Sequence, residues 1–185
     1  MDLNKLSFKH GYPLHIAILT EKFDIALDLL HSPATNPHVL NTIGANIIHL
    51  LFVKYDKDAE TALRILHRCL DLGVNVNLVD QIYAAPIHIA LRKKQYQAIK
   101  DMVSINTSSG RQVFDFNIKD KRGQTPLHFA VEKQDYDMFH ALICDQWIDA
   151  NIVENEDFYK ARRLSVIFSA FHKMLYRKEK FPMRA

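Results

Sequence analysis

The chain has 185 residues, of which 48% are hydrophobic and 24% are charged, and its formal net charge is +3. This hydrophobic content excludes general disorder, and the length allows either one domain with a substantial core or a short solenoid. No apolar run approaches the roughly 20 residues that span a bilayer, no signal peptide is evident, and two cysteines fit a reducing compartment, so we expect an intracellular, cytoplasmic protein.

The first predicted pair of helices lies within residues 2–37. Its first helix should begin at Pro13, because proline suits the first helical position, and its second should run from about Asp24. Pro33 and Pro37 should end the second helix. The apolar residues expected to be buried at helical spacing are Leu14, Ala17 and Ile18, followed by Ile25, Ala26, Leu29 and Leu30.

The second pair, within residues 38–76, is less regular. Asn46 can cap its first helix through its side chain, and residues 53–61 lengthen the connection to the next helix. That helix resumes at Ala62, and Gly73 offers a left-handed cap at its end.

The third and fourth pairs are predicted from similar signals. The expected helices cover about 86–94, 96–104 and 136–146, and a polar, exposed loop is expected at 105–112. The first helices end without glycine, at Glu21, Lys94 and Gln134. A left-handed conformation at such a position costs on the order of 1 kcal/mol for a residue with a side chain.

The clearest local signal is Gly-Gln-Thr-Pro-Leu-His-Phe-Ala at residues 123–130. Gly123 permits the positive φ of a tight turn, Thr125 can cap a helix, and Pro126 suits its first position. The histidine of this stretch recurs at intervals of 34, 39 and 40 residues, as His15, His49, His88 and His128. Eight residues before each histidine stands a residue that can cap a turn through its side chain, namely Ser7, Asn41, Asp80 and Asp120.

These residues resemble the T-P-L-H-x-A signature of ankyrin repeats, which recur about every 33 residues. The chain is identified as a member of that family, with four divergent repeats at about 2–37, 38–76, 77–116 and 117–150. Asn151, Glu154 and Arg162 mark a degenerate fifth. The resemblance implies an all-α solenoid of stacked antiparallel helix pairs with β-turn fingers, covering residues 1–157.

The resemblance also implies that the fingers and the first helices line a concave groove that binds a protein. The corresponding fingertip positions are Phe8, Lys9, Thr42, Ile43, Gln81, Ile82, Tyr83, Lys121 and Arg122. The corresponding positions on the first helices are Leu19, Thr20, Val53, Lys54, Arg92, Lys93, Glu132 and Lys133. Because the early positions are mostly apolar and the late ones mostly basic, we predict an apolar anchor zone with a cationic end. The partner itself is not identified by these residues.

The sequence offers no catalytic or metal-binding constellation. The four recurring histidines belong to different repeats, so we assign them a structural hydrogen-bonding role together with Gly123, Thr125 and Pro126. No close set of metal ligands or glycine-rich phosphate loop is present. We therefore expect a monomeric, non-enzymatic interaction module or scaffold, with no cofactor and no metal.

The C-terminal segment, residues 158–185, has a charge balance of +7 against −4 for the rest of the chain. Its apolar residues recur at helical spacing, which predicts a basic amphipathic helix that acts as a degenerate fifth repeat or cap. One alternative is that this segment binds nucleic acid or acidic lipid, in a salt-dependent way. Another is that the chain is the substrate- or partner-targeting domain of a larger multidomain protein whose catalytic part lies outside these residues. A terminal repeat normally has a polar outer face, whereas this segment carries apolar and aromatic residues.

Overall fold

The computed structural model describes residues 12–82, 84–105 and 112–143. Within these residues the chain forms eight α-helices and one short 3-10 helix, η1. Their bounds are α1 (Pro13–Leu19), α2 (Phe23–His31), α3 (Ile47–Lys54), η1 (Tyr55–Lys57), α4 (Ala59–Asp71), α5 (Pro86–Lys93), α6 (Tyr96–Ser104), α7 (Pro126–Glu132) and α8 (Tyr136–Ile143).

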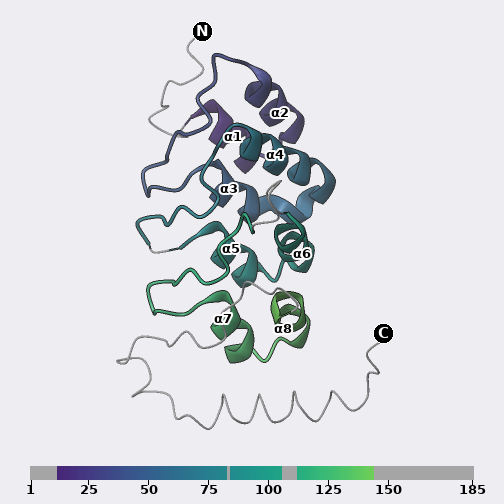
Figure 1. The fold of residues 1–185 in the computed structure, drawn as a ribbon. Helices are drawn as coiled ribbons and strands as arrows, with labels where there is room; N and C mark the ends of the chain where they lie inside the picture. The colour runs from purple at the N-terminus through teal and green to yellow at the C-terminus, as the bar shows by residue number, and fades with distance from the viewer. Residues whose placement is uncertain (1–11, 83, 106–111, 144–185) are drawn as a thin grey trace.

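The helices form antiparallel pairs that stack in one direction. The first helices of the pairs, α1, α3, α5 and α7, contact one another in sequence, and the second helices, α2, α4, α6 and α8, form a parallel row behind them. Figure 1 shows the two rows side by side, with the connecting loops projecting from the side of the first helices. The predicted all-α solenoid is confirmed.

Local capping chemistry determines where the first helices begin. Pro13, Pro86 and Pro126 each occupy the first turn, where the missing amide donor is not needed. The exception is α3, where the Asn46 side-chain oxygen accepts from the amides of Ile48 and His49 at 3.1 and 3.3 Å. The expected cap at Asn46 is thus present, and it compensates for the absence of proline.

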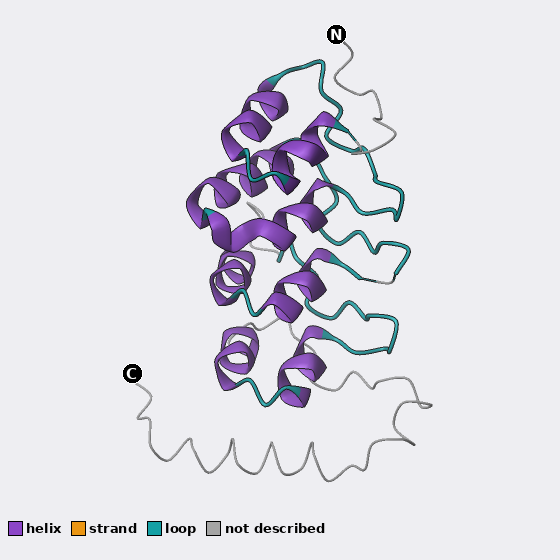
Figure 2. Ribbon diagram, turned by 180° about the vertical axis from the view of Figure 1, so that it is seen from behind, coloured by secondary structure: helices purple, strands orange, loops and turns teal. Residues whose placement is uncertain are grey.

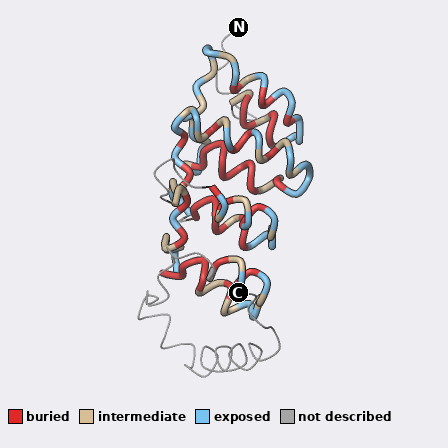
Figure 3. The backbone as a smooth tube through the Cα atoms, turned by 45° about the vertical axis from the view of Figure 1, so that its right-hand side comes forward, coloured by how far each residue is buried: buried red, intermediate tan, exposed pale blue. Residues whose placement is uncertain are grey.

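One continuous core lies between the two rows of helices (Figure 3). The face of α2 differs from the prediction, which placed Ile25 and Leu29 in the core. Helix α2 begins one residue earlier, at Phe23, and this residue is only 5% exposed, whereas Ile25 is 53% exposed. The buried positions of α2 are therefore Phe23, Ala26, Leu27 and Leu30. Leu29 is half-buried at the edge of the core.

The first helices of three pairs end in a left-handed residue that is not glycine. Glu21, Lys94 and Gln134 have φ values of +62°, +57° and +52°. All three positions thus adopt the left-handed conformation without glycine. Each of these residues therefore holds a backbone conformation that a side chain disfavours.

The lengthened connection of the second pair folds into η1 and packs inward. Its first residue, Tyr55, is fully buried, and its ring stacks on Phe52 with centroids 5.3 Å apart. The Tyr55 hydroxyl donates to Asp101 Oδ2 of α6 at 2.7 Å. Phe114, from the segment that follows the other inserted loop, meets the Phe52 ring with centroids 6.4 Å apart. The insertion therefore joins the second repeat to two parts of the third, which the sequence did not predict.

Several predictions lie outside the described residues. They concern the fingertip residues Phe8, Lys9 and Tyr83, the loop at 106–111, the end of the 136–146 helix and the whole segment 158–185. None of the described helices is long and apolar enough to cross a bilayer.

Candidate partner-binding surface

Three projecting loops, which we call the second, third and fourth fingers, precede α3, α5 and α7. They comprise residues 40–45, 79–84 and 119–124, and Tyr83 within the third finger lies outside the described residues. Figure 2 shows the loops stacked on one side of the molecule, beyond the first helices. Their backbones therefore present successive side chains along the direction of the stack.

The three fingers share one hydrogen-bonding scaffold. In each, the side-chain Oδ1 atom of an Asn or Asp accepts from the amides two and four residues later, at 2.8–3.1 Å. The acceptors and their donors are Asn41 with Ile43 and Ala45, Asp80 with Ile82 and Ala84, and Asp120 with Arg122 and Gln124. The amide of each capping residue also donates to the carbonyl four residues on, at 2.9–3.0 Å. The same set of side-chain and backbone bonds therefore holds each of the three fingers.

Neighbouring fingers touch. The amide of Gln81 in the third finger donates to the carbonyl of Ile43 in the second finger at 2.9 Å. Gly44, at φ +74°, lies beside this contact, and a Cβ at that position would stand 3.3 Å from Cγ of Gln81. Gly123 occupies the same place in the fourth finger, with φ +78°. Glycine suits the positive φ at both positions, and a Cβ at Gly44 would also press on the side chain of Gln81.

The exposed side chains change character from finger to finger. Two positions flank each scaffold, one just before the capping residue and one two residues after it. In the second finger they hold Leu40 and Ile43, which are 45% and 42% exposed. In the third finger they hold Val79 and Ile82, which are 38% and 53% exposed. In the fourth finger both positions are cationic and exposed, as Lys119 and Arg122, with Lys121 between them.

The structure thereby adds Leu40 and Val79 to the residues that sequence reasoning selected. They were missed because fingertip positions were counted only after the capping residue. The signal was available in the sequence, since an apolar residue directly precedes both Asn41 and Asp80. The remaining fingertip predictions, Thr42 and Gln81, are exposed between the apolar positions.

The predicted binding positions on the first helices of the early repeats differ in exposure. Leu19 is 41% exposed, and the exposed Thr20 donates its hydroxyl to Ile16 O at 2.8 Å. Val53 and Lys54 are half-buried. Lys54 pairs with Glu21 of the preceding repeat at 2.7 Å, and this pairing lowers the pKa of the Glu21 carboxyl.

In the later repeats the first-helix positions are charged. Arg92 and Lys93 are exposed at the end of α5, and Arg92 Nε donates to the carbonyl of His88 at 3.1 Å. Glu132 is half-buried and accepts from Nε2 of the buried Gln124 at 2.9 Å. Lys133 lies 3.6 Å from Glu132. Glu132 is thus engaged with the base of its own finger and faces a cation.

The recurring histidines lie at the base of the fingers. Nδ1 of His49 and His88 accepts from the amide of the helix-capping residue at 3.3 and 3.0 Å, and His128 repeats the contact with Thr125 N at 3.3 Å. Because Nδ1 accepts, the neutral ring carries its hydrogen on Nε2, which in His49 donates to Ala84 O of the next finger at 3.0 Å. The ring thus links one repeat to the next.

His15 and His88 are buried with fewer partners. Within the described residues, neither ring nitrogen of His15 makes a hydrogen bond, and Nε2 of His88 makes none either. Burial lowers the pKa of His15, His49 and His88. All three rings are therefore held in their neutral form, which suits a packed junction and not a site that exchanges protons at its surface.

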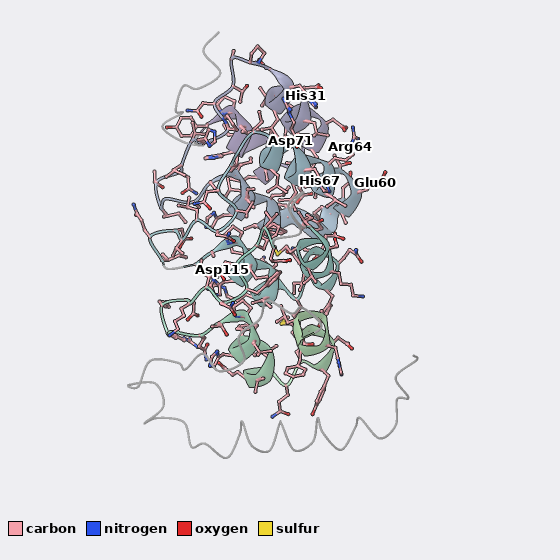
Figure 4. All side chains as sticks on the ribbon, viewed as in Figure 1. His31, Glu60, Arg64, His67, Asp71 and Asp115 are labelled. Atoms are coloured by element: carbon pink, nitrogen blue, oxygen red, sulfur yellow. The ribbon has the colours of Figure 1, made fainter. Side chains whose placement is uncertain are left out.

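Other groups capable of chemistry do not converge. Figure 4 labels Glu60, Arg64, His67 and Asp71 along α4, with His31 on the neighbouring α2. The four α4 residues are exposed, and no group of three possible metal ligands occurs in the described part of the chain. Asp115 lies apart from them. The thiol of Cys69 is buried, and burial raises its pKa to about 12, so it is not a ready nucleophile.

Comparison with known proteins agrees with the repeat architecture. A family model described as ankyrin repeats (3 copies) matches residues 46–155. The nuclear factor NF-kappa-B p105 subunit of Gallus gallus is 24% identical over 133 residues, which is 72% of this chain and 12% of that protein. The chain thus covers only a small part of the length of this relative.

Proposed function

The chain belongs to the ankyrin-repeat family, whose repeats are generally protein–protein interaction modules, and we propose that it binds a segment of a partner protein along its fingers and first helices. The fold alone does not establish this function, because one fold serves many. The observation that carries the proposal is the distribution of exposed apolar side chains.

Six large apolar side chains are strongly exposed in the described residues. Four of them lie on the second and third fingers, and Leu19 lies at the end of the first helix α1. Only Ile25 belongs to the outer row of helices. Apolar residues gathered on one rigid surface favour binding, because their burial releases water and the scaffold is already ordered.

The module acts without catalysis in this proposal. Ankyrin-repeat domains are typically non-catalytic. Thr125 Oγ1 lies 2.7 Å from His128 Nδ1, but Thr125 is buried and its side chain caps α7. A scaffold role in the cytoplasm, as a monomer, is the simplest setting. The chain could equally serve as the recognition part of a larger protein, since it covers 12% of the length of its relative. The mass of the natural gene product distinguishes these two settings.

Affinity capture with matched variants tests the proposal. The full chain is used as bait in three forms: wild type, Ile43→Ser with Ile82→Ser, and Lys121→Glu with Arg122→Glu. Ile25→Ser is the control, because Ile25 and Ile82 are both 53% exposed but lie on different surfaces. We expect the same partner to be captured by wild type and control and lost from both finger variants. Equal capture by all four proteins, with unchanged circular dichroism, refutes binding at the fingers.

A further inference from the structure

The spacing of the fingers restricts the shape of a segment that can contact all three. The bond from Gln81 N to Ile43 O at 2.9 Å joins the tips of the second and third fingers. Each finger leads into a first helix, and the first helices pack on one another in sequence. Packed helices have axes about 8–10 Å apart, which sets the interval between successive fingers. Equivalent fingertip side chains therefore recur at this interval.

A polyproline II segment matches this interval. It rises about 3.1 Å per residue with three residues per turn, so that every third side chain points the same way after about 9.3 Å. This interval lies within the range of about 8–10 Å expected for the fingers. A β-strand presents one face about every 6.6 Å, which is below that range. An α-helix presents positions i and i+7 every 10.5 Å or so, which is above it.

The fingers also differ in the chemistry of their exposed side chains along the stack. The second and third fingers each present two exposed aliphatic side chains, Leu40 with Ile43 and Val79 with Ile82. The fourth finger presents Lys119, Lys121 and Arg122 from the same scaffold. Apolar side chains are complementary to the first two fingers and carboxylates to the last.

We infer that the finger surface recognises an extended protein segment in polyproline II conformation that carries apolar residues at two positions three apart and acidic residues three positions further on. This inference rests on the proposed function and specifies its partner. The apolar side chains lie against the second and third fingers. The acidic residues lie against Lys121 and Arg122 and fix the register of the segment on the stack.

Synthetic peptides test the spacing directly. Fluorescein-labelled peptides carry Leu at positions 1 and 4 and Glu at 7 and 8, with Pro and Ser between, and are titrated with the full chain by fluorescence anisotropy. A peptide of the same composition with Leu at 1 and 3 and Glu at 5 and 6 is the matched control. A third peptide, alanine-rich and helical, has a spacing of seven. We expect the period of three to bind about tenfold more tightly than either alternative.

Variants of the chain locate the binding. Ile43→Ser with Ile82→Ser should weaken the period-three peptide about tenfold or more, whereas Ile25→Ser should leave its affinity unchanged. Lys121→Glu with Arg122→Glu should reverse the charge preference, so that a peptide ending in Lys now binds better than one ending in Glu, and added salt should weaken binding of the Lys peptide.

Equal affinity for the period-three and control peptides overturns the inference, as does a loss of binding in Ile25→Ser. Binding of anionic vesicles or single-stranded RNA without any peptide binding overturns it as well. The two proposals fail separately. If capture of partners depends on the fingers but no period-three preference is found, the partner chemistry is wrong and the function stands. If capture is insensitive to every finger variant, the function itself fails.

Discussion

Lys94 offers a test of how the repeats tolerate a side chain in a left-handed conformation. It follows α5 with φ +57° and ψ +38°, and its amide donates to Leu91 O at 3.0 Å. Its side chain is exposed. Replacing it by glycine removes a steric cost of about 1–2 kcal/mol and adds about 0.5–1 kcal/mol of conformational entropy cost on folding. We expect Lys94→Gly to stabilise the chain by about 0.5–1 kcal/mol, the difference between these terms.

Lys93→Gly provides the internal control for this prediction. Lys93 is equally exposed but is the last residue of α5, so glycine there adds entropy cost without relieving strain and should destabilise by about 0.5–1 kcal/mol. Urea unfolding followed by circular dichroism measures both free energies of unfolding. In a thermal scan, a change of 1 kcal/mol corresponds to roughly 2–4 °C in Tm for a chain of this size. The two neighbouring substitutions should therefore shift Tm in opposite directions.

The other left-handed positions predict a graded series. Gln134→Gly should resemble Lys94→Gly, because both residues are exposed with similar φ. Glu21→Gly should gain less, since it also removes the ion pair with Lys54, and a surface pair of this kind contributes about 0–1 kcal/mol. If Lys94→Gly destabilises as much as Lys93→Gly, strain relief at the helix end is not the operative effect and the reasoning is refuted.

Two further predictions concern buried polar groups. Tyr55→Phe should destabilise by about 1–3 kcal/mol, because it removes the hydroxyl that donates to the Asp101 carboxylate in a partly buried contact. A change below about 0.5 kcal/mol in urea unfolding contradicts this. Burial lowers the pKa of His15, His49 and His88, so the unfolded chain binds more protons than the folded one at acidic pH. Stability should therefore fall as pH drops below about 6.5, the unfolded value, and an unchanged urea midpoint between pH 7.5 and 5.5 rules this out.

Much of the fold could be predicted from sequence because its signals are local. Proline at the first helical position and a side-chain cap act within one turn, so the third pair, predicted at about 86–94 and 96–104, is found at Pro86–Lys93 and Tyr96–Ser104. The left-handed residues at the ends of the first helices follow from the same locality. Because these signals recur along the chain, they predict a stack of similar helix pairs.

The errors concern contacts between segments far apart in sequence. Whether Ile25 or Leu27 faces the core depends on how α2 is rotated against α4, and helical spacing allows both choices. The inward packing of Tyr55 depends on Asp101, which lies 46 residues away in sequence, and on Phe52, whose ring in turn meets that of Phe114. No local pattern contains this information. The omission of Leu40 has a different cause, because the fingertip positions were counted only after the capping residue Asn41.

In this molecule the residues that stabilise a finger differ from the residues that would recognise a partner, because all three fingers share one pattern of hydrogen bonds. The turns are held by the side chains of Asn41, Asp80 and Asp120, which accept from backbone amides. The side chains at the flanking positions take no part in these bonds, so they are available to vary. An aliphatic residue and a cation can therefore occupy the same backbone position, as Ile82 and Arg122 do, without altering the turn. It follows that substitutions at flanking positions should change which segment is bound, whereas substitutions of the capping residues should change whether a finger forms at all. One finger therefore differs from another in its flanking side chains, while all three share the bonds that hold the turn.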